Sequence, residues 1–208
     1  MDKVYLLSQI NLLEELPQSE LIKLDKVTNT LPIKKGTVVM SPTNRIKTFF
    51  LLKKGQVRLY KITSTGKEFT LDILGEGNVF GETTSFSLTD GDIYAETMVD
   101  SFVCTLSKER FENFVHQNPG IALKLISILS SKLAEVYRIS ESIAYRDVKH
   151  RLVLLLIRLS NKFGVRRGDW QTIDLKITQN DLASMIGSSR ESVSILFGEL
   201  MEERIIIR

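Results

Sequence analysis

The sequence predicts an α+β protein: an amino-terminal antiparallel β-roll, a long dimerisation helix and a carboxy-terminal winged helix-turn-helix domain. Three observations predict this fold. Glycines at short intervals divide residues 31–106 into apolar runs of strand length. Apolar residues then recur at heptad spacing along residues 118–144, and residues 177–200 have the capping and glycine pattern of two short helices. We therefore expect domains at 1–117 and 145–208, with the helix 118–144 between them.

The composition is ordinary for a globular protein. With 208 residues, of which 43% are hydrophobic and 25% charged, the chain has room for two small domains with separate cores. Its longest apolar run is too short for a membrane span, and its amino terminus lacks the residue pattern of a signal peptide. We expect a protein that works in the compartment where it is made, with no membrane partner.

The roll is expected from short strands between glycine turns. Residues 4–16 and 19–26 predict two short amphipathic helices, with Pro17 between them. The runs TVVM, FFLLKKGQVRLYKI, FTLDIL and VFGE then predict strands, with hairpin turns at Lys54-Gly55 and Thr65-Gly66. Strands of this length and spacing favour an antiparallel sandwich or roll.

Metal and thiol chemistry find little support. The one cysteine, Cys104, excludes an internal disulfide and a cluster bound by thiolates, and its surroundings FVCTL predict a buried strand. The two histidines, His116 and His150, stand in separate helical segments without acidic or thiol neighbours at ligand spacing. The sequence therefore predicts no metal site, no cofactor and no catalytic residue.

The long helix begins after Asn118-Pro119 and has one narrow apolar face. The residues of that face recur at alternating spacings of four and three for three heptads, which predicts a parallel dimer with an identical helix opposite. The alternative is a single helix packed on its own roll, which another face, with Ile121, Leu125 and Ile128, would also allow. The expected dimer seam is Ala122, Ile126, Leu129, Leu133, Val136, Ser140 and Ile143.

Residues 177–200 predict a helix-turn-helix. Thr178 and Asp181 stand at the first and fourth places of a capping box, and Gly187 ends the helix that they begin. Ser188 and Glu191 repeat the cap pattern, so a second helix is expected almost at once. Such a short connection makes the helices cross steeply. The expected inward residues are Leu182, Ala183, Ile186, Val193, Leu196 and Leu200.

The second helix of such a motif places its first residues in the major groove of DNA. An arginine there can donate to both acceptors of guanine, a glutamate can accept from cytosine, and serines suit base edges or phosphates. A two-helix hairpin with a solvated outer face is the alternative. The expected DNA-binding residues are Thr178, Gln179, Ser188, Ser189, Arg190, Glu191, Ser194 and Ile195.

The connecting segments complete the prediction. Ser107 is expected to cap a short helix through His116, and a helix over 146–159 to follow a hinge at Asp147. Residues 164–171 are expected to form a polar loop, 172–176 an extended segment, and 204–208 the start of a strand, which leaves the wing short. From Tyr145 onward the chain carries 11 Lys or Arg against 8 Asp or Glu, whereas the residues before it carry 17 of each. The basic surplus therefore lies with the helix-turn-helix, which favours a surface that meets phosphates.

The chain resembles the CRP/FNR family of bacterial transcription regulators over essentially its whole length. The motifs that carry the resemblance are PIKKGTVV, FFLLKKGQVRLYK, NVFGE, the Asn118-Pro119 helix start and IGSSRESVSILFGELMEERII. The segments ESIAYRDVKHRLVLLLIRLSNKFGV and TIDLKITQNDLASMIGSSR are most similar to the nitrogen regulators of cyanobacteria and red-algal plastids. The resemblance implies a jelly roll like that of cyclic-nucleotide-binding domains and a homodimer on a palindromic site in double-stranded DNA. It also implies RNA polymerase as a partner, and the cyanobacterial cytoplasm or the plastid stroma as the location.

The resemblance also implies an effector pocket in the roll. Cyclic-nucleotide binders of the family hold the phosphate with an arginine after the Gly-Glu turn. Here no Lys or Arg occurs from Gly81 to Ser107, and Asp90 and Asp92 occupy the loop where the arginine is expected. Because two carboxylates repel a phosphate, we expect no binding of cyclic AMP.

For the nitrogen regulators, the resemblance implies a pocket for 2-oxoglutarate. Backbone groups after a Phe-Gly pair, an arginine of the roll, and an arginine and a glutamate of the dimer helix hold this ligand. Lys132 keeps one positive charge, Asp92 reverses the other and Tyr137 replaces the carboxylate, so we expect weak or absent 2-oxoglutarate binding. The matching positions here are Phe80, Gly81, Glu82, Thr83, Asp92, Lys132 and Tyr137.

The expected function is a dimeric, sequence-specific transcription regulator without catalysis. Regulators of the family commonly carry a second arginine five residues after the first, where this chain has Ile195, which can contact a thymine methyl group but cannot read guanine. An enzyme on a cupin-like roll would need clustered metal ligands, and neither histidine lies in the roll. A small-molecule sensor of the same fold that acts through protein contacts, with weakened DNA binding, is the remaining alternative.

Overall fold

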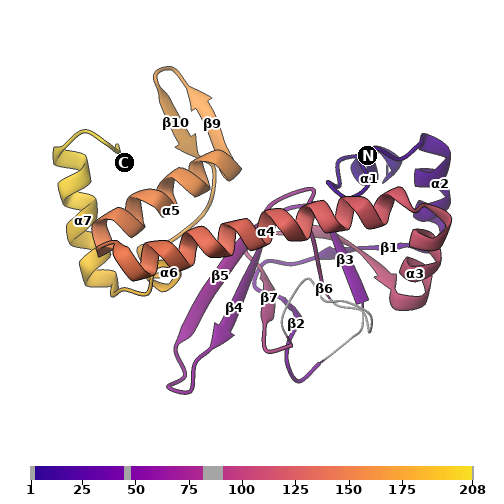
Figure 1. The fold of residues 1–208 in the computed structure, drawn as a ribbon, viewed down its shortest axis with the longest axis horizontal. Coiled ribbons are helices and arrows are strands. Elements are labelled where there is room, and N and C mark those ends of the chain that lie inside the picture. Colours follow the sequence, from indigo (N-terminus) through magenta and orange to yellow (C-terminus); the bar gives the residue numbers. More distant parts are fainter. Residues whose placement is uncertain (1–2, 45–47, 82–90, 208) are drawn as a thin grey trace. The chain divides into compact units, whose positions relative to one another are not determined.

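The computed structural model describes residues 3–44, 48–81 and 91–207, and its contacts divide the chain into two compact units (Figure 1). Unit 1 consists of residues 1–61 and 72–134, and unit 2 of residues 62–71 and 135–208. The division by contacts falls inside the long helix. The domain boundaries expected at 117 and 145 follow the secondary structure instead, and they stay a prediction.

Unit 1 begins with two helices, α1 (Lys3–Ser8) and α2 (Gln18–Val27). α1 is shorter than the helix expected over 4–16, which was wrong in length. After Ser8 the backbone turns, and the N–H of Asn11 donates to the carbonyl oxygen of Gly77 at 2.9 Å. Leu12 and Leu13 are buried although they lie outside a helix. Their apolar spacing therefore reflects burial in turns and not a continuous helical face.

Two four-stranded sheets form the roll. One has the strand order β1-β8-β3-β6 and the other β2-β7-β4-β5, and the pairs β1/β8, β3/β8, β3/β6, β2/β7 and β4/β7 are antiparallel. The predicted antiparallel roll is confirmed. The strands are β1 (Asn29–Ile33), β2 (Val38–Met40), β3 (Thr48–Lys54), β4 (Val57–Ile62), β5 (Glu68–Leu74), β6 (Val79–Gly81), β7 (Tyr94–Thr97) and β8 (Ser101–Ser107).

One of the two expected hairpin turns is wrong. The turn at Thr65-Gly66 does join β4 to β5, with the N–H of Thr63 donating to the carbonyl oxygen of Lys67 at 2.8 Å. At Lys54-Gly55, in contrast, the chain passes from β3 in one sheet to β4 in the other. Gly55 has φ +106° there, and a Cβ atom on it would lie 2.2 Å from Ser101 Oγ. A glycine turn can close a hairpin or lead from one sheet to another. Only the pairing of strands distant in sequence decides which of the two occurs.

The core of unit 1 lies between the first sheet and the helices that cover it. Phe49 of β3 stacks on Phe111 of α3 (Lys108–Gln117), with ring centroids 4.3 Å apart. Cys104 is fully buried on β8, as expected. The side chains buried in this cluster come from the α1–α2 region, β3, β6, β8, α3 and the start of α4: Leu7, Ile10, Leu12, Leu13, Leu21, Leu24, Phe49, Leu51, Val79, Cys104, Leu106, Phe111, Phe114, Ile121 and Leu125.

The two helix starts predicted at Ser107 and at Asn118-Pro119 are confirmed. The side-chain oxygen of Ser107 accepts a hydrogen bond from the backbone N–H of Arg110 and caps α3. The long helix α4 follows as Gly120–Tyr145. Its Ile121 and Leu125 are buried in the core of unit 1, so a face of α4 does pack on the roll. The expected seam lies on a different face: Ile126, Leu129, Leu133, Val136 and Ile143 are all exposed.

Unit 2 holds the carboxy-terminal helices around one small core. Residues 164–171 do not form the expected loop, because Gly164 to Ile173 form a hairpin that turns at Gly168, with φ +63°. No strand is present over residues 204–207, where one was expected to begin. The elements are α5 (Val148–Phe163), β9 (Gly164–Arg167), β10 (Trp170–Ile173), α6 (Gln179–Ile186) and α7 (Arg190–Glu202).

Candidate DNA-binding site

The first helix of the candidate site, α6, begins with the predicted capping box. The backbone N–H of Asp181 donates to Thr178 Oγ1 at 3.1 Å, and the backbone N–H of Thr178 donates to Asp181 Oδ2 at 2.9 Å. Two N–H groups that the helix leaves without a partner are thereby satisfied. Gln179, the first residue of α6, is half-buried beside this cap, whereas Thr178 is exposed. The cap fixes where the chain enters the helix pair.

The turn between the two helices is also as predicted. Gly187 adopts the left-handed conformation, with φ +63° and ψ 47°. Both its N–H and the N–H of Ser188, at 2.9 Å, donate to the carbonyl oxygen of Ala183. A side chain at Gly187 would be strained in this conformation. The turn is therefore only a few residues long, and α7 begins directly after it.

The second helix, α7, begins one residue later than expected. Ser189, not Ser188, is the cap: its Oγ accepts a hydrogen bond from the backbone N–H of Ser192 at 3.1 Å. Ser188 instead supplies its backbone N–H to the end of α6. Two adjacent serines both satisfy the sequence pattern, and the hydrogen bonds that close Gly187 decide which of them remains to cap α7.

α6 and α7 are held against α5 by apolar packing. Val193 and Leu200 of α7 are completely buried, and Ala183 of α6 is 3% exposed. Leu196 is half-buried against the same cluster, so the expected inward face of α7 is confirmed. The buried members are Leu152, Leu155, Leu159, Leu182, Ala183, Ile186, Val193 and Leu200. Because this core fixes the inner face of α7, its outer face is presented to solvent in a defined direction.

The outer face at the start of α7 carries the predicted recognition residues. Arg190, Glu191, Ser194 and Ile195 are exposed, and Ile195 is 66% exposed despite being apolar. These four side chains occupy the first two turns of the helix, where a groove-binding helix contacts bases. Ser188 is half-buried and Ser189 is exposed but engaged in the cap. The structure thus places together on one exposed helix start the residues that the sequence assigned to base reading.

The carboxyl group of Glu191 interacts with groups at the start of α7. The pKa of its carboxyl group is lowered, chiefly by a hydrogen bond from its own backbone N–H and next by the side chain of Ser189, with a smaller contribution from the charge of Arg190. A carboxylate that neutralises the positive end of the helix supports the capping role of Glu191. To accept from a cytosine amino group, the side chain has to leave these partners.

The far end of α7 is tied to α5 by a charged cluster that the sequence did not reveal. Lys149 Nζ lies 2.6 Å from Glu203 Oε1 and 3.1 Å from Glu199 Oε2. Both hydrogen bonds raise the pKa of Lys149, that with Glu203 more than that with Glu199. Glu199 and Glu203 are four residues apart and therefore share one helix face. Their spacing was a usable signal, but the partner lysine is about fifty residues away in sequence.

A backbone feature follows this cluster. Arg204 has φ +57°, in the left-handed region, and the N–H of Ile205 donates to the carbonyl oxygen of Leu200 at 2.9 Å. This is the usual way for a helix to end, but glycine normally occupies the left-handed position. The side chain of Arg204 is exposed. The backbone of Arg204 is therefore strained, because a residue with a side chain occupies a position that favours glycine.

Of the seven residues expected to line an effector pocket, five lie in the described part of the chain, and their assembly into a pocket stays a prediction. Phe80 is 1% exposed and stacks on Phe50, with ring centroids 4.9 Å apart, so it serves the core. Gly81 has φ +103°, and a Cβ atom there would lie 2.3 Å from the carbonyl oxygen of Thr48. Asp92 is exposed, and Lys132 of unit 1 is half-buried. Tyr137 belongs to unit 2 and is 66% exposed, whereas Glu82, Thr83 and Asp90 lie outside the described residues.

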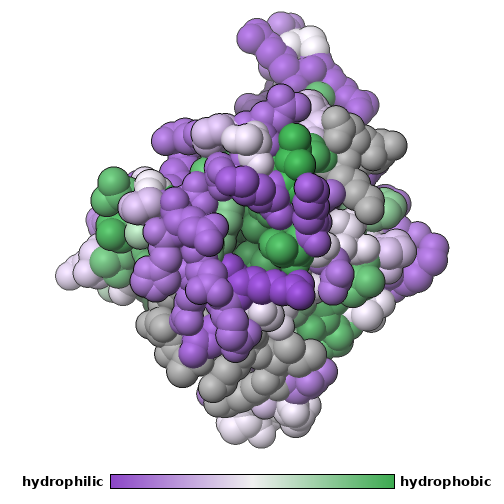
Figure 2. All heavy atoms as spheres, turned by 90° about the vertical axis from the view of Figure 1, so that its right-hand side faces the viewer, coloured by the Kyte–Doolittle hydropathy of each residue, from purple (hydrophilic) through white to green (hydrophobic). Residues whose placement is uncertain are grey.

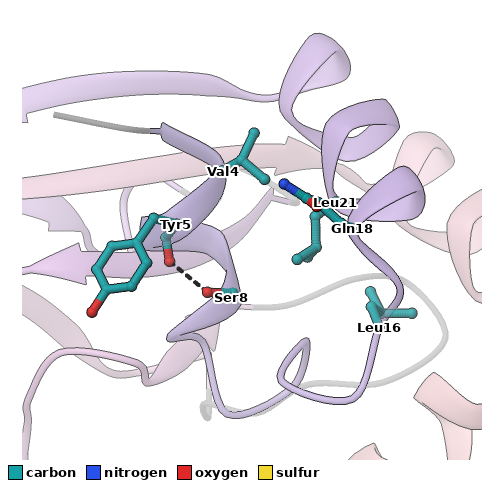
Figure 3. A pocket seen from close by; sticks show the side chains of 6 residues that line it. All are labelled: Val4, Tyr5, Ser8, Leu16, Gln18 and Leu21. Carbon is teal, nitrogen blue, oxygen red and sulfur yellow. Dashed lines mark hydrogen bonds between the residues drawn. The ribbon is translucent and has the colours of Figure 1, made fainter.

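A shallow cavity of about 340 Å³ lies between α1 and α2 (Figure 3). No charged side chain lines it, and Ser8 Oγ already donates to the backbone oxygen of Tyr5 at 2.7 Å. Figure 2 shows hydrophobic surface bordered by hydrophilic side chains at the end of unit 1 that carries these helices. The lining therefore offers no cationic group to a carboxylate or a phosphate. The lining residues are Val4, Tyr5, Ser8, Leu16, Gln18 and Leu21.

Two further properties concern the helices and the potential metal-binding side chains in the described part of the chain. None of these helices is long and apolar enough to cross a membrane. Over the same residues, no group of three or more His, Cys, Asp or Glu side chains is placed to hold a metal ion.

Two known domain families match this chain. Residues 30–118 match the cyclic nucleotide-binding domain, and residues 150–208 match the Crp-like helix-turn-helix domain. The global nitrogen regulator of Nostoc sp. strain PCC 7120 is 31% identical over 174 residues, which cover 83% of this chain and 78% of that protein. The anaerobic regulatory protein of Bacillus subtilis is 28% identical over 186 residues, covering 88% of this chain and 77% of that protein.

Solved structures agree with these matches. A CRP/FNR-family transcriptional regulator from Thermus thermophilus superposes with a TM-score of 0.65 at 29% identity, over 84% of this chain and 87% of that chain. A mutant of CooA from Carboxydothermus hydrogenoformans shares the fold, with a TM-score of 0.76 at 24% identity over 89% of this chain and 82% of that chain. With the roll and the helix-turn-helix both matched, and a relative 31% identical over 83% of the chain, this chain belongs to the CRP/FNR family of transcription regulators.

Proposed function

We propose that this regulator binds a palindromic DNA site as a homodimer and reads each half-site with the first two turns of α7. The exposed start of α7, with Arg190 as its first residue, is the observation that carries the proposal. An arginine at this place can donate to O6 and N7 of one guanine, which is the most common specific contact in the major groove. Thr178 and Gln179 at the start of α6, and Ser188 and Ser189 before α7, supply phosphate contacts that position the helix.

The homodimer is supported by the exposed apolar face of α4. Ile126 is 59% exposed, Leu133 51% and Ile143 58%, although the helix is otherwise anchored to its own roll through Ile121 and Leu125. An apolar seam of this length in water favours a second, identical helix. Two-fold symmetry then presents two α7 helices to half-sites about one DNA turn apart.

Selection of binding sites from random DNA, followed by gel shifts, tests the DNA-reading role. Arg190→Ala should reduce discrimination between the selected site and a scrambled site about ten-fold or more, because one guanine contact is lost. Salt-sensitive binding to the scrambled site should survive, since it depends on phosphates. Arg166→Ala is the matched control, as Arg166 is an exposed arginine on β9 of the same unit. Equal discrimination by Arg190→Ala and wild type would refute the proposal.

We further propose that neither cyclic AMP nor 2-oxoglutarate is a strong effector. Asp92 stands, exposed, at the position that would need a cation, and Phe80 is packed in the core. Lys132 offers one ammonium group, which is a weaker partner for a carboxylate than a bidentate guanidinium. Titration calorimetry should show no micromolar binding of either compound, and Asp92→Arg should raise the affinity for an anion if the pocket is otherwise intact.

The remaining parts of the proposal follow from the relatives. As a transcription regulator bound at promoters, the protein would meet RNA polymerase, which a pull-down on promoter DNA with purified polymerase tests directly. The similarity to cyanobacterial nitrogen regulators supports action in the cyanobacterial cytoplasm, or in the plastid stroma for a plastid-encoded gene. Fractionation of the source cells with an antibody against the protein distinguishes these compartments.

A further inference from the structure

An exposed apolar stripe on α5 has no role in the core of unit 2. Leu154 is 49% exposed and Ile157 52% exposed, while Leu152, Leu155 and Leu159 on the opposite side of the same helix are buried. Leu154 and Ile157 are three residues apart and therefore neighbours on one helix face. Large aliphatic side chains grouped in this way on a surface mark a contact with another molecule.

An ion pair places this stripe beside the expected dimer seam. Arg158 Nη1 of α5 lies 2.9 Å from Glu135 Oε1 of α4, and both residues belong to unit 2. Leu154 stands one helical turn before Arg158, so it lies on the side of α5 that is directed toward α4. On α4, Ile139 and Ile143 follow Glu135 by one and two turns and continue the apolar face toward the seam. The stripe on α5 is thus continuous with the face of α4 that a second copy would cover.

The geometry of a two-fold dimer determines which part of the second copy reaches the stripe. With 100° per residue, Glu135 and Tyr137 lie on opposite sides of the seam residue Val136. A two-fold rotation about the seam exchanges these sides, so that the second copy brings its Tyr137 next to Glu135 and α5 of the first. Tyr137 is 66% exposed, which leaves its ring available for such a contact.

We propose that the dimer interface extends from the α4 seam onto the DNA-binding unit, where Tyr137 of one copy packs on Leu154 and Ile157 of the other. The contact occurs twice by symmetry. It links the α5 of each copy, and through the shared core its α7, to the helix of the opposite copy. The separation of the two recognition helices then depends on this contact as well as on the seam. The inference rests on the homodimer proposed above.

Cross-linking between differently tagged copies tests the contact directly. One copy carries Leu154→Cys, the other Tyr137→Cys, and a short bismaleimide is added to the mixed dimer. The native Cys104 is fully buried, so the introduced thiols are the reactive ones. We expect a covalent species containing both tags. Val165→Cys paired with Tyr137→Cys is the matched control, because Val165 is 45% exposed on β9 of the same unit, and it should give no such species.

Association measurements provide a second readout on the intact protein. Leu154→Gln with Ile157→Gln should weaken dimerisation in sedimentation experiments about ten-fold or more, whereas Val165→Gln should leave it unchanged. A dimer that Leu133→Glu dissociates, but that shows neither the cross-link nor the weakened association, would overturn the inference and leave the homodimer standing. A wild-type chain that stays monomeric at all concentrations, with and without DNA, would refute both.

Discussion

Thr178 and Asp181 exchange hydrogen bonds across the first turn of α6: the side chain of each accepts from the backbone N–H of the other, at 3.1 and 2.9 Å. The two residues were identified from their spacing, and no contact from elsewhere in the chain is needed to form the motif. The helix pair that presents Arg190 therefore begins at a site fixed by four consecutive residues.

Removing this cap should destabilise the DNA-binding unit. Thr178→Ala takes away the acceptor for the Asp181 N–H, which should cost about 1 kcal/mol of unfolding free energy. Thermal or urea unfolding measures the change. Thr178→Ser keeps a hydroxyl acceptor and should lie much closer to wild type. If the alanine and serine variants were equally stable, the cap would contribute nothing.

The left-handed conformation of Arg204 predicts a stabilising glycine. Arg204→Gly removes the contact between Cβ and the carbonyl group that makes φ +57° unfavourable and should raise the unfolding free energy by up to about 1 kcal/mol. Glu202→Gly is the control, since Glu202 is the exposed last residue of α7, where glycine adds flexibility to the unfolded chain without relieving a left-handed conformation. The two substitutions should therefore shift the unfolding midpoint in opposite directions. A lower midpoint for Arg204→Gly would contradict the strain argument.

The charged cluster at the end of α7 predicts a salt-dependent contribution. Lys149→Met should lower the unfolding midpoint at low ionic strength, and the difference from wild type should shrink as salt is added, because the cluster is partly exposed. Lys149→Arg should restore most of the loss. The raised pKa of Lys149 means that the contribution is complete below about pH 10, the ordinary lysine range, and is lost only as pH rises through the folded value. A difference that does not change between low and high salt would argue against ion pairing.

Ile195 predicts an altered half-site. Because its side chain is 66% exposed in the first two turns of α7, where Arg190 also stands, it should contact an apolar feature of the groove such as a thymine methyl group. Ile195→Arg should move the preference at one position of the selected site toward guanine, by about 1 to 3 kcal/mol of discrimination. Ile195→Val, which stays apolar, should keep the wild-type preference. Site selection with the three proteins in parallel would show whether this position is read at all.

Local features of the site could be predicted because their causes are local. The capping box at Thr178, the left-handed turn at Gly187 and the inward face with Val193 and Leu200 each depend on a few residues close together in sequence. The sequence pattern predicts the cap of α7 at Ser188, whereas the structure has it at Ser189. Both serines fit the pattern, and the choice is made by the two N–H groups that the carbonyl oxygen of Ala183 accepts.

By itself the sequence determined the class of the fold, the order of its elements, the helix-turn-helix and the apolar face of α4, since hydrophobic periodicity and capping residues act within one element. Only the tertiary structure decided that the turn at Gly55 joins two sheets and that Lys149 holds Glu199 and Glu203. Each of these depends on groups that are distant along the chain. Their partners are selected by packing and strand pairing, which no local pattern encodes.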